Sequence, residues 1–229
     1  MKNTILTAMI FGIIQINVHA TISSGQASSL KMVNEDLVLD QSLAIEWARD
    51  AKLAKTMCDT GHPLWQSFKP ETVALGTDRS RADICLQDGM MNWYEASAWI
   101  SHLNKHAFLG YSDWRLPHTR QSDTTCSHRF ESELSQEYFT FGSGCKNSEL
   151  SHLFHSSLGN PANRGRECKQ DCLTNPGPFR NVSDSMYWSG TEISFDSSLV
   201  GVFDIGSDWQ DAENKTSDLL HVWPVRSLN

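Results

Sequence analysis

The residues best suited to binding chemistry form an acidic cluster near the C-terminus. It comprises Asp204, Asp208, Trp209 and Asp211. Carboxylates at such short spacing can bind calcium, so Asp204, Asp208 and Asp211 are candidate calcium ligands. Trp209 beside them can stack on the face of a sugar. The spacing differs from that of an EF-hand loop, and a solvated hairpin loop rich in Asp and Asn is the alternative.

Other candidate sites are weaker. His102 and His106 stand four residues apart, and His152 and His155 stand three apart. Neither pair lies in an H-E-x-x-H motif, so solvated histidines are favoured over metal ligands. The chain contains no G-x-S-x-G motif, P-loop or dinucleotide fingerprint. We therefore assign no catalytic residue and expect no cofactor, with calcium the one candidate ion.

All six cysteines follow residue 57. An even number of cysteines is typical of disulfides in an oxidising compartment. Proximity along the chain favours pairing Cys126 with Cys145 and Cys168 with Cys172, which leaves Cys58 for Cys85. A zinc site is the alternative, but no C-x-x-C motif occurs.

The elements that must position these residues are few. One helix is expected over residues 92–107, where Asn92 can cap and Glu95 stands three positions on, and a second from Ser148 to Gly159. Strands are expected over residues 37–39, 186–192, 199–205 and 221–228. The last three should pair with one another and bury aromatic residues beneath the two helices. Residues 58–89, 124–145 and 160–185 read as long loops.

The segment Gly110–Pro117, sequence GYSDWRLP, ends the first of these helices. Gly110 can adopt a positive φ after the last helical turn, and Pro117 favours extended backbone at Leu116. Trp114 should seat in the core while Arg115 bonds to loop carbonyls or to an acid. A ligand contact by Arg115 is the alternative.

Four motifs in order resemble the Lcl C-terminal domain family, over roughly residues 33–228. The family pattern is a W-x-E-A helix, a G-Y-x-D-W-R-L-P turn, a Y-W-S-[ST]-T-E strand and a final V-R-P-V-R-like strand. This chain departs at Val222, where an Arg often stands, and carries an unusual insertion around residues 168–175. The residues that carry the resemblance are Trp93, Asp113, Trp114, Arg115, Leu116, Pro117, Tyr187, Trp188 and Arg226.

The resemblance implies a C-type-lectin-like α+β domain, with two main helices packed on a small antiparallel sheet and long disulfide-stapled loops. It also implies a bacterial extracellular binding or adhesion module, because the family's namesake is a collagen-like adhesin that binds sulfated glycans through this domain. This chain lacks collagen repeats and is acidic, so that glycan specificity is not carried over.

The N-terminus predicts export. Residues 1–20 combine Lys2, an apolar run and a Val18-His19-Ala20 ending, which is typical of a signal peptide cleaved near Ala20. Residues 21–31 are expected to be a flexible lead-in, and residues 32–229 a single domain. The mature protein should be secreted or periplasmic, with no membrane insertion.

Charge and composition narrow the partners. The formal net charge of −8 becomes −9 when Lys2, the one charged residue of the signal peptide, is removed. This acidity argues against nucleic acid as a partner. We expect a binding module for a glycan or a protein, without catalysis. A structural or assembly component of the envelope is the first alternative and an exported enzyme the second, and the oligomeric state is left open.

Overall fold

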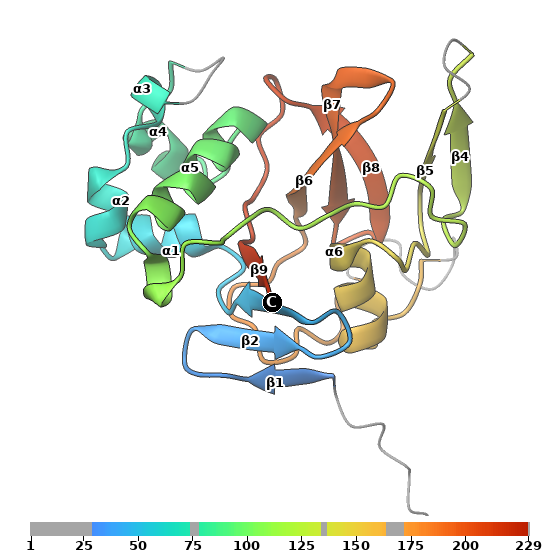
Figure 1. Ribbon diagram of the computed structural model, residues 1–229, viewed down its shortest axis with the longest axis horizontal. Coiled ribbons are helices and arrows are strands. Elements are labelled where there is room, and N and C mark those ends of the chain that lie inside the picture. Colours follow the sequence, from blue (N-terminus) through green and yellow to red (C-terminus); the bar gives the residue numbers. More distant parts are fainter. Residues whose placement is uncertain (1–28, 74–77, 134–136, 164–171, 229) are drawn as a thin grey trace, which may run out of the picture.

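The computed structural model describes residues 29–73, 78–133, 137–163 and 172–228. In these residues the chain forms three antiparallel sheets and several short helices (Figure 1). The proposed signal peptide lies outside the described residues, as does most of the expected lead-in. Leu30 and Lys31, also expected in the lead-in, belong to the first strand.

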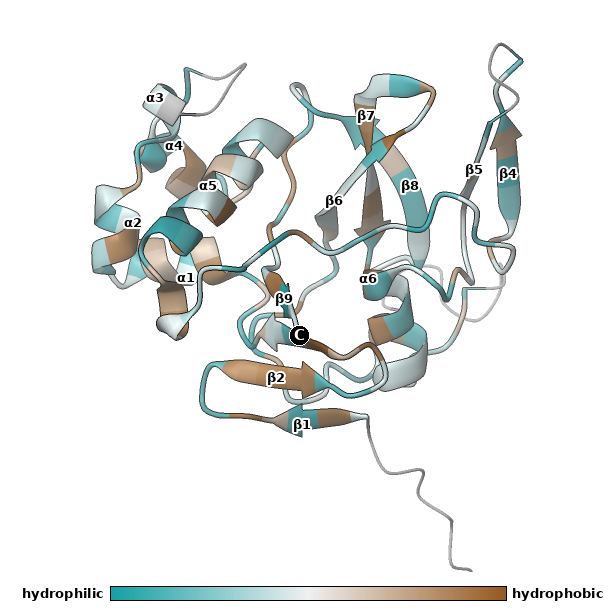
Figure 2. Ribbon diagram, in the orientation of Figure 1, coloured by the Kyte–Doolittle hydropathy of each residue, from teal (hydrophilic) through white to brown (hydrophobic). Residues whose placement is uncertain are grey.

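The first sheet joins the two ends of the domain. Its strand order is β1-β2-β3-β9, with all neighbours antiparallel. The strands are β1 (Leu30–Met32), β2 (Leu37–Asp40), β3 (Ile45–Ala48) and β9 (Val225–Ser227). Figure 2 shows β2 as largely hydrophobic, in keeping with its burial. The C-terminal strand therefore pairs with β3. Of the expected strand 221–228, only His221 pairs with β6, through an isolated parallel bridge to Tyr187, so the expected antiparallel pairing with residues 186–205 was wrong.

The second and third sheets lie next to each other. The second pairs β4 (His128–Glu131) with β5 (Tyr138–Phe141), and the third has the order β6-β7-β8. The strands of the third sheet are β6 (Met186–Ile193), β7 (Asp196–Asp204) and β8 (Trp209–Asn214). A bridge between Gly142 and Gln210 links the end of β5 to β8. The segments expected to be the loop 124–145 and the acidic hairpin loop thus contain strands.

The helices that precede residue 111 gather at one end of the molecule (Figure 1). They are α1 (Leu53–Asp59), α2 (Pro63–Ser67), α3 (Pro70–Val73), α4 (Arg81–Leu86), α5 (Trp93–Lys105) and the short 3-10 turn η1 (Phe108–Gly110). The Asn92 and Glu95 capping box begins α5, as expected. The expected loop 58–89 contains α2, α3 and α4, because His62 caps α2 ahead of Pro63 and a Ser80–Asp83 capping box begins α4.

The second expected helix is split. Residues 149–152 form α6 (Glu149–His152), and the chain then widens into a π-helical turn, η2 (Leu153–Ser157). The amide of Leu158 bonds to the carbonyl of Leu153, five residues back. The predicted fold of two main helices on one small sheet was therefore wrong. Only α5 is a long helix among the described residues, and sheets dominate.

Aromatic side chains fill the core. Trp99, on the buried face of α5, belongs to one apolar cluster, and Trp47 and Trp223 belong to a second cluster around the first sheet. The rings of Trp47 and Trp223 meet at 5.2 Å between centroids, in an edge-to-face arrangement. The sequence predicted burial of Phe203, Trp223 and one of Tyr187 and Trp188, and all four are buried, although not beneath two main helices.

The GYSDWRLP segment contacts both the helical end of the domain and the first sheet. Gly110 has a φ of +87°. Trp114 is buried and donates from Nε1 to the carbonyl of Phe108 at 3.0 Å, and Leu116 and Pro117 are also buried. The backbone of Arg115 pairs with that of Val225 in β9.

Three ion pairs hold this segment to its surroundings. The Arg115 guanidinium donates to both Glu149 carboxylate oxygens at 2.7 Å. Arg226 donates to Asp113 at 2.9 Å and to Glu46 at 2.6 Å. Bidentate pairs of this kind fix orientation, so the conformation of the segment is determined by these partners.

Candidate functional site

A cleft of about 690 Å³ lies where the β4–β5 hairpin meets the start of β8. Its walls come from segments far apart in the sequence. One wall is the approach to β4, another is the turn after β5, a third is the segment that follows η2, and the last is the beginning of β8. The lining residues are Thr125, Ser127, His128, Ser143, Gly144, Lys146, Ala162, Asn163 and Trp209.

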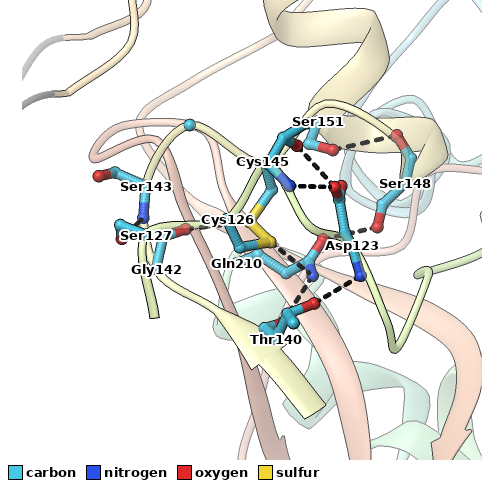
Figure 3. Close-up of a disulfide and its surroundings, with 12 residues drawn as sticks. Asp123, Cys126, Ser127, Thr140, Gly142, Ser143, Cys145, Ser148, Ser151 and Gln210 are labelled. Atoms are coloured by element: carbon cyan, nitrogen blue, oxygen red, sulfur yellow. Dashed lines mark hydrogen bonds between the residues drawn. A yellow bond between two sulfur atoms is a disulfide. The ribbon is translucent and has the colours of Figure 1, made fainter. Parts of the chain in front are cut away.

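A disulfide joins two of these walls. Cys126 lies between Thr125 and Ser127, and it is bonded to Cys145, which lies between Gly144 and Lys146. Figure 3 shows this disulfide beside the paired backbones of the two strand ends. Four lining residues are thus direct sequence neighbours of the bonded cysteines.

The other cysteines are also accounted for as far as the structure describes them. Cys58 is bonded to Cys85, so this pair and Cys126–Cys145 are two of the three pairings expected from sequence. The third, Cys168–Cys172, involves Cys168, which lies outside the described residues. Cys172 itself is fully buried.

The Asp123 side chain links the same two walls of the cleft by hydrogen bonds. Its carboxylate is fully buried and accepts hydrogen bonds from the Thr125 hydroxyl at 2.6 Å and from the Asn147 side chain at 2.7 Å. The backbone amide of Asn147 donates to it at 2.8 Å. Burial raises the pKa of Asp123, but these hydrogen bonds lower it by more, so the pKa lies below its ordinary value. The ionised carboxylate therefore stabilises the cleft.

Gln210 fastens the hairpin to β8. Its side chain is fully buried, accepts from the Ser148 hydroxyl at 2.6 Å and donates to the Thr140 carbonyl at 3.0 Å. Its backbone exchanges two hydrogen bonds with Gly142. Figure 3 shows Gln210 beside Thr140, Ser148 and the Cys126–Cys145 disulfide. Gln210 directly follows Trp209 in the sequence, so these buried polar contacts also hold the backbone next to Trp209.

Asp208 lies behind the cleft and is fully buried. One oxygen pairs with His155 Nε2 at 2.7 Å, and the other accepts from the backbone amides of Asn163 at 2.8 Å and Gly144 at 3.1 Å. Asp208 has a φ of +52°, a conformation that Asp and Asn tolerate better than most residues. It therefore joins η2 to two of the lining segments.

Trp209 provides the largest apolar surface of the cleft. Its ring is partly exposed and lies 5.6 Å from the His128 ring, centroid to centroid, and 6.5 Å from Phe141. The His128 ring in turn stacks on Phe141 at 5.3 Å. The indole Nε1 donates to Asp211 at 2.9 Å, which fixes the ring. These rings make one wall aromatic, while the remaining walls carry the side chains of three hydroxyl residues, Lys146, Ala162 and Asn163.

The predicted calcium ligands are not brought together. Asp204 bonds to the Ser207 hydroxyl and to the Gly206 amide, Asp208 is buried, and Asp211 holds Trp209. Within the described ranges, the one trio of potential metal-binding side chains is Cys58, Asp59 and Cys85. Both of these cysteines are in a disulfide, so they have no thiolate to offer. The acidic cluster therefore supplies Trp209 and Asp208 to the cleft, but no shared site for calcium.

The histidine pairs serve local contacts. His102 bonds to the carbonyl of Leu64, and its ring lies 4.3 Å from that of His106. His152 bonds to the Ser42 hydroxyl, whereas His155 faces Asp208. The remaining lining residues were not predicted as a site, because their polar types are ordinary for loops. In the sequence, only the position of several of these residues next to Cys126 and Cys145 could have indicated that they lie close together.

A second ionisable cluster is separate from this cleft. Lys52 donates to Asp88 at 2.6 Å, and His221 Nε2 lies 3.6 Å from the same carboxylate. Burial, with a smaller contribution from the Lys52 charge, lowers the pKa of His221 to about 4. Burial raises the pKa of Asp88, but the Lys52 hydrogen bond and the nearby positive charges lower it by more.

The fold and the cleft define a disulfide-containing domain of three antiparallel sheets with a polar, partly aromatic cleft at a sheet junction. The Lcl C-terminal domain family matches residues 36–226, and the chain belongs to this family. Searches of curated proteins and of solved structures found no significant match. In the described part of the chain, no helix has the length and apolar character needed to cross a membrane.

Proposed function

We propose that this protein is an exported binding module that recognises a carbohydrate in the cleft beside Trp209. The observation that carries the proposal is the partly exposed indole in a wall of a cleft lined by hydroxyls and an amide. A Trp ring offers an apolar face to the C–H side of a sugar, and its edge is held in place by Asp211. The cleft volume of about 690 Å³ falls in the range usual for small-ligand sites.

The polar side chains of the cleft can form hydrogen bonds with the hydroxyl groups of a sugar. Ser143 offers a hydroxyl that can donate or accept, and Lys146 offers an ammonium that can donate. The Thr125 hydroxyl and the Asn163 amide also line the cleft, but they already bond to Asp123 and to the Ser207 carbonyl. The disulfide and the buried Asp123 and Asp208 hold their backbones, so little ordering is required on binding. Export rests on the signal-like residues 1–20 and on the presence of disulfides.

A glycan array tests the proposal. The oxidised protein lacking residues 1–20 should bind a defined subset of glycans, and Trp209→Ala should weaken that binding at least tenfold. Tyr94→Ala is the matched control, because Tyr94 is a partly buried aromatic residue of α5 that does not line the cleft. Equal loss in both variants would assign the effect to folding.

The alternatives predict other outcomes. Glycan binding that survives Trp209→Ala would move the site elsewhere on the molecule. No binding to any glycan would reject the proposal. In that case, self-association in sedimentation experiments would favour the envelope assembly component.

A further inference from the structure

Two neighbouring residues of the cleft form a nucleophile and base pair. The Ser127 hydroxyl oxygen lies 2.7 Å from His128 Nδ1, and both residues are exposed and line the cleft. The sequence contains no hydrolase motif, and side chains of adjacent residues in an extended strand normally point to opposite faces. Their contact here is therefore a specific local arrangement.

The surrounding backbone fixes this contact. The Ser143 amide donates to the Ser127 oxygen at 3.0 Å, and the Ser127 amide donates to the Ser143 carbonyl at 3.1 Å. Because the Ser127 oxygen accepts from an N–H, its own hydrogen is free to be donated to Nδ1. The His128 ring is held by stacking on Phe141. The Cys126–Cys145 disulfide adjoins the paired serines (Figure 3).

Gly142 leaves the space that this arrangement needs. It has a φ of +98°, and a Cβ there would collide with the Ser127 hydroxyl and with His128 Nδ1. A residue with a side chain would thus force the pair apart. Lys146 lines the same cleft, and its ammonium makes no hydrogen bond within the described ranges.

We propose that Ser127 is a nucleophile, with His128 as its general base, which takes the acyl group of a small carboxylic ester bound in this cleft. This inference does not rest on the carbohydrate proposal, since any acyl ester small enough for the cleft satisfies it. Serine is a weak nucleophile alone and is activated when an adjacent base takes its proton.

The chemistry balances without any co-reactant other than water. The Ser127 oxygen attacks the ester carbonyl carbon while His128 Nδ1 takes the hydroxyl proton. The tetrahedral oxyanion is stabilised by the positive charge of Lys146. The C–O bond to the alcohol then breaks, and the alcohol leaves with the proton from Nδ1. Water attacks the acyl-serine carbonyl carbon and gives one proton to Nδ1. The bond from this carbon to the Ser127 oxygen then breaks and that oxygen takes the proton back from Nδ1, which releases the carboxylic acid and restores both Ser127 and His128.

Labelling with a fluorophosphonate probe tests the proposal, because the probe reacts covalently with activated serines. Intact mass should show one phosphonyl group for each folded protein, and peptide mapping should place it on Ser127. Ser127→Ala should abolish the labelling, and His128→Gln should slow it at least a hundredfold, the usual scale of general base catalysis. Ser101→Ala is the matched control and should label at the wild-type rate, because Ser101 is also an exposed serine followed by a histidine, His102, but lies on α5 and does not line the cleft.

Three results would overturn the proposal. These are no labelling of the folded wild-type protein, labelling at another residue, or an unchanged rate in His128→Gln. Circular dichroism of each variant checks folding, and His128→Asn replaces any His128→Gln preparation that does not fold. Glycan array binding of the Ser127→Ala variant separates this proposal from the carbohydrate proposal, because Trp209 is intact in that variant.

Discussion

Replacing Asp208 by Ala should destabilise the protein far more than replacing Asp211, although both acids lie in the same cluster. Asp208 is fully buried and accepts from one ring N–H and two backbone amides that come from two other segments. The Ala variant leaves these donors without their acceptor. It also places Ala at a φ of +52°, where a side chain other than Asp or Asn costs roughly 1–2 kcal/mol.

The expected loss of unfolding free energy is about 3 kcal/mol, of which about 2 kcal/mol comes from the buried donors left without an acceptor and about 1 kcal/mol from the positive φ. For a chain of this size, that loss lowers the melting temperature by about 6–12 °C. Asp208→Asn keeps an acceptor oxygen and tolerates the positive φ, so its loss should be about half as large.

Urea unfolding followed by tryptophan fluorescence measures the effect. With a slope of about 3 kcal/mol per M, the Ala variant should unfold about 1 M earlier than the wild type. Asp211→Ala is the control, because Asp211 is partly exposed and should cost less than about 1 kcal/mol. Equal midpoints for the two Ala variants would refute the assignment of Asp208 as the buried link between η2 and the cleft.

Three further predictions concern pH, the disulfide and calcium. Because the pKa of His221 is depressed to about 4 in the folded state, stability should fall as the pH drops from about 6.5 towards 4, and His221→Asn should remove much of this slope in acid unfolding titrations. Replacing Cys126 and Cys145 together by Ser opens a loop of 19 residues. The free energy of unfolding measured in urea should fall by about 3 kcal/mol, and glycan binding should be lost. Glycan binding that persists would contradict the role of the disulfide in shaping the cleft. Millimolar calcium should leave the melting temperature unchanged, since Asp204, Asp208 and Asp211 already accept hydrogen bonds from the protein; a rise of several degrees would show that these carboxylates rearrange around the ion.

Local sequence signals were sufficient where a few neighbouring residues determine the conformation. The capping box of Asn92 and Glu95 predicted the start of α5, and the glycine at position 110 predicted the positive φ at the last residue of η1. The short-range signals failed where strands are made by pairing. Strands β4 and β8 are polar, so they resemble loops until the hydrogen bonds of a neighbouring strand are counted. Strand β5, with the sequence YFTF, carries the aromatic residues typical of a strand, and this local signal was missed.

The sequence by itself determined the family, the first long helix, the aromatic core residues and two disulfides, because motifs, caps and apolar side chains act through local or additive effects. Only the tertiary structure decided the arrangement into three sheets and the pairing of β9 with β3. It also decided that Trp209 faces a cleft while the three aspartates point to separate partners. The physical reason is that a cleft depends on which distant backbones pair, and here buried Asp123, Asp208 and Gln210 make those connections over long separations in sequence.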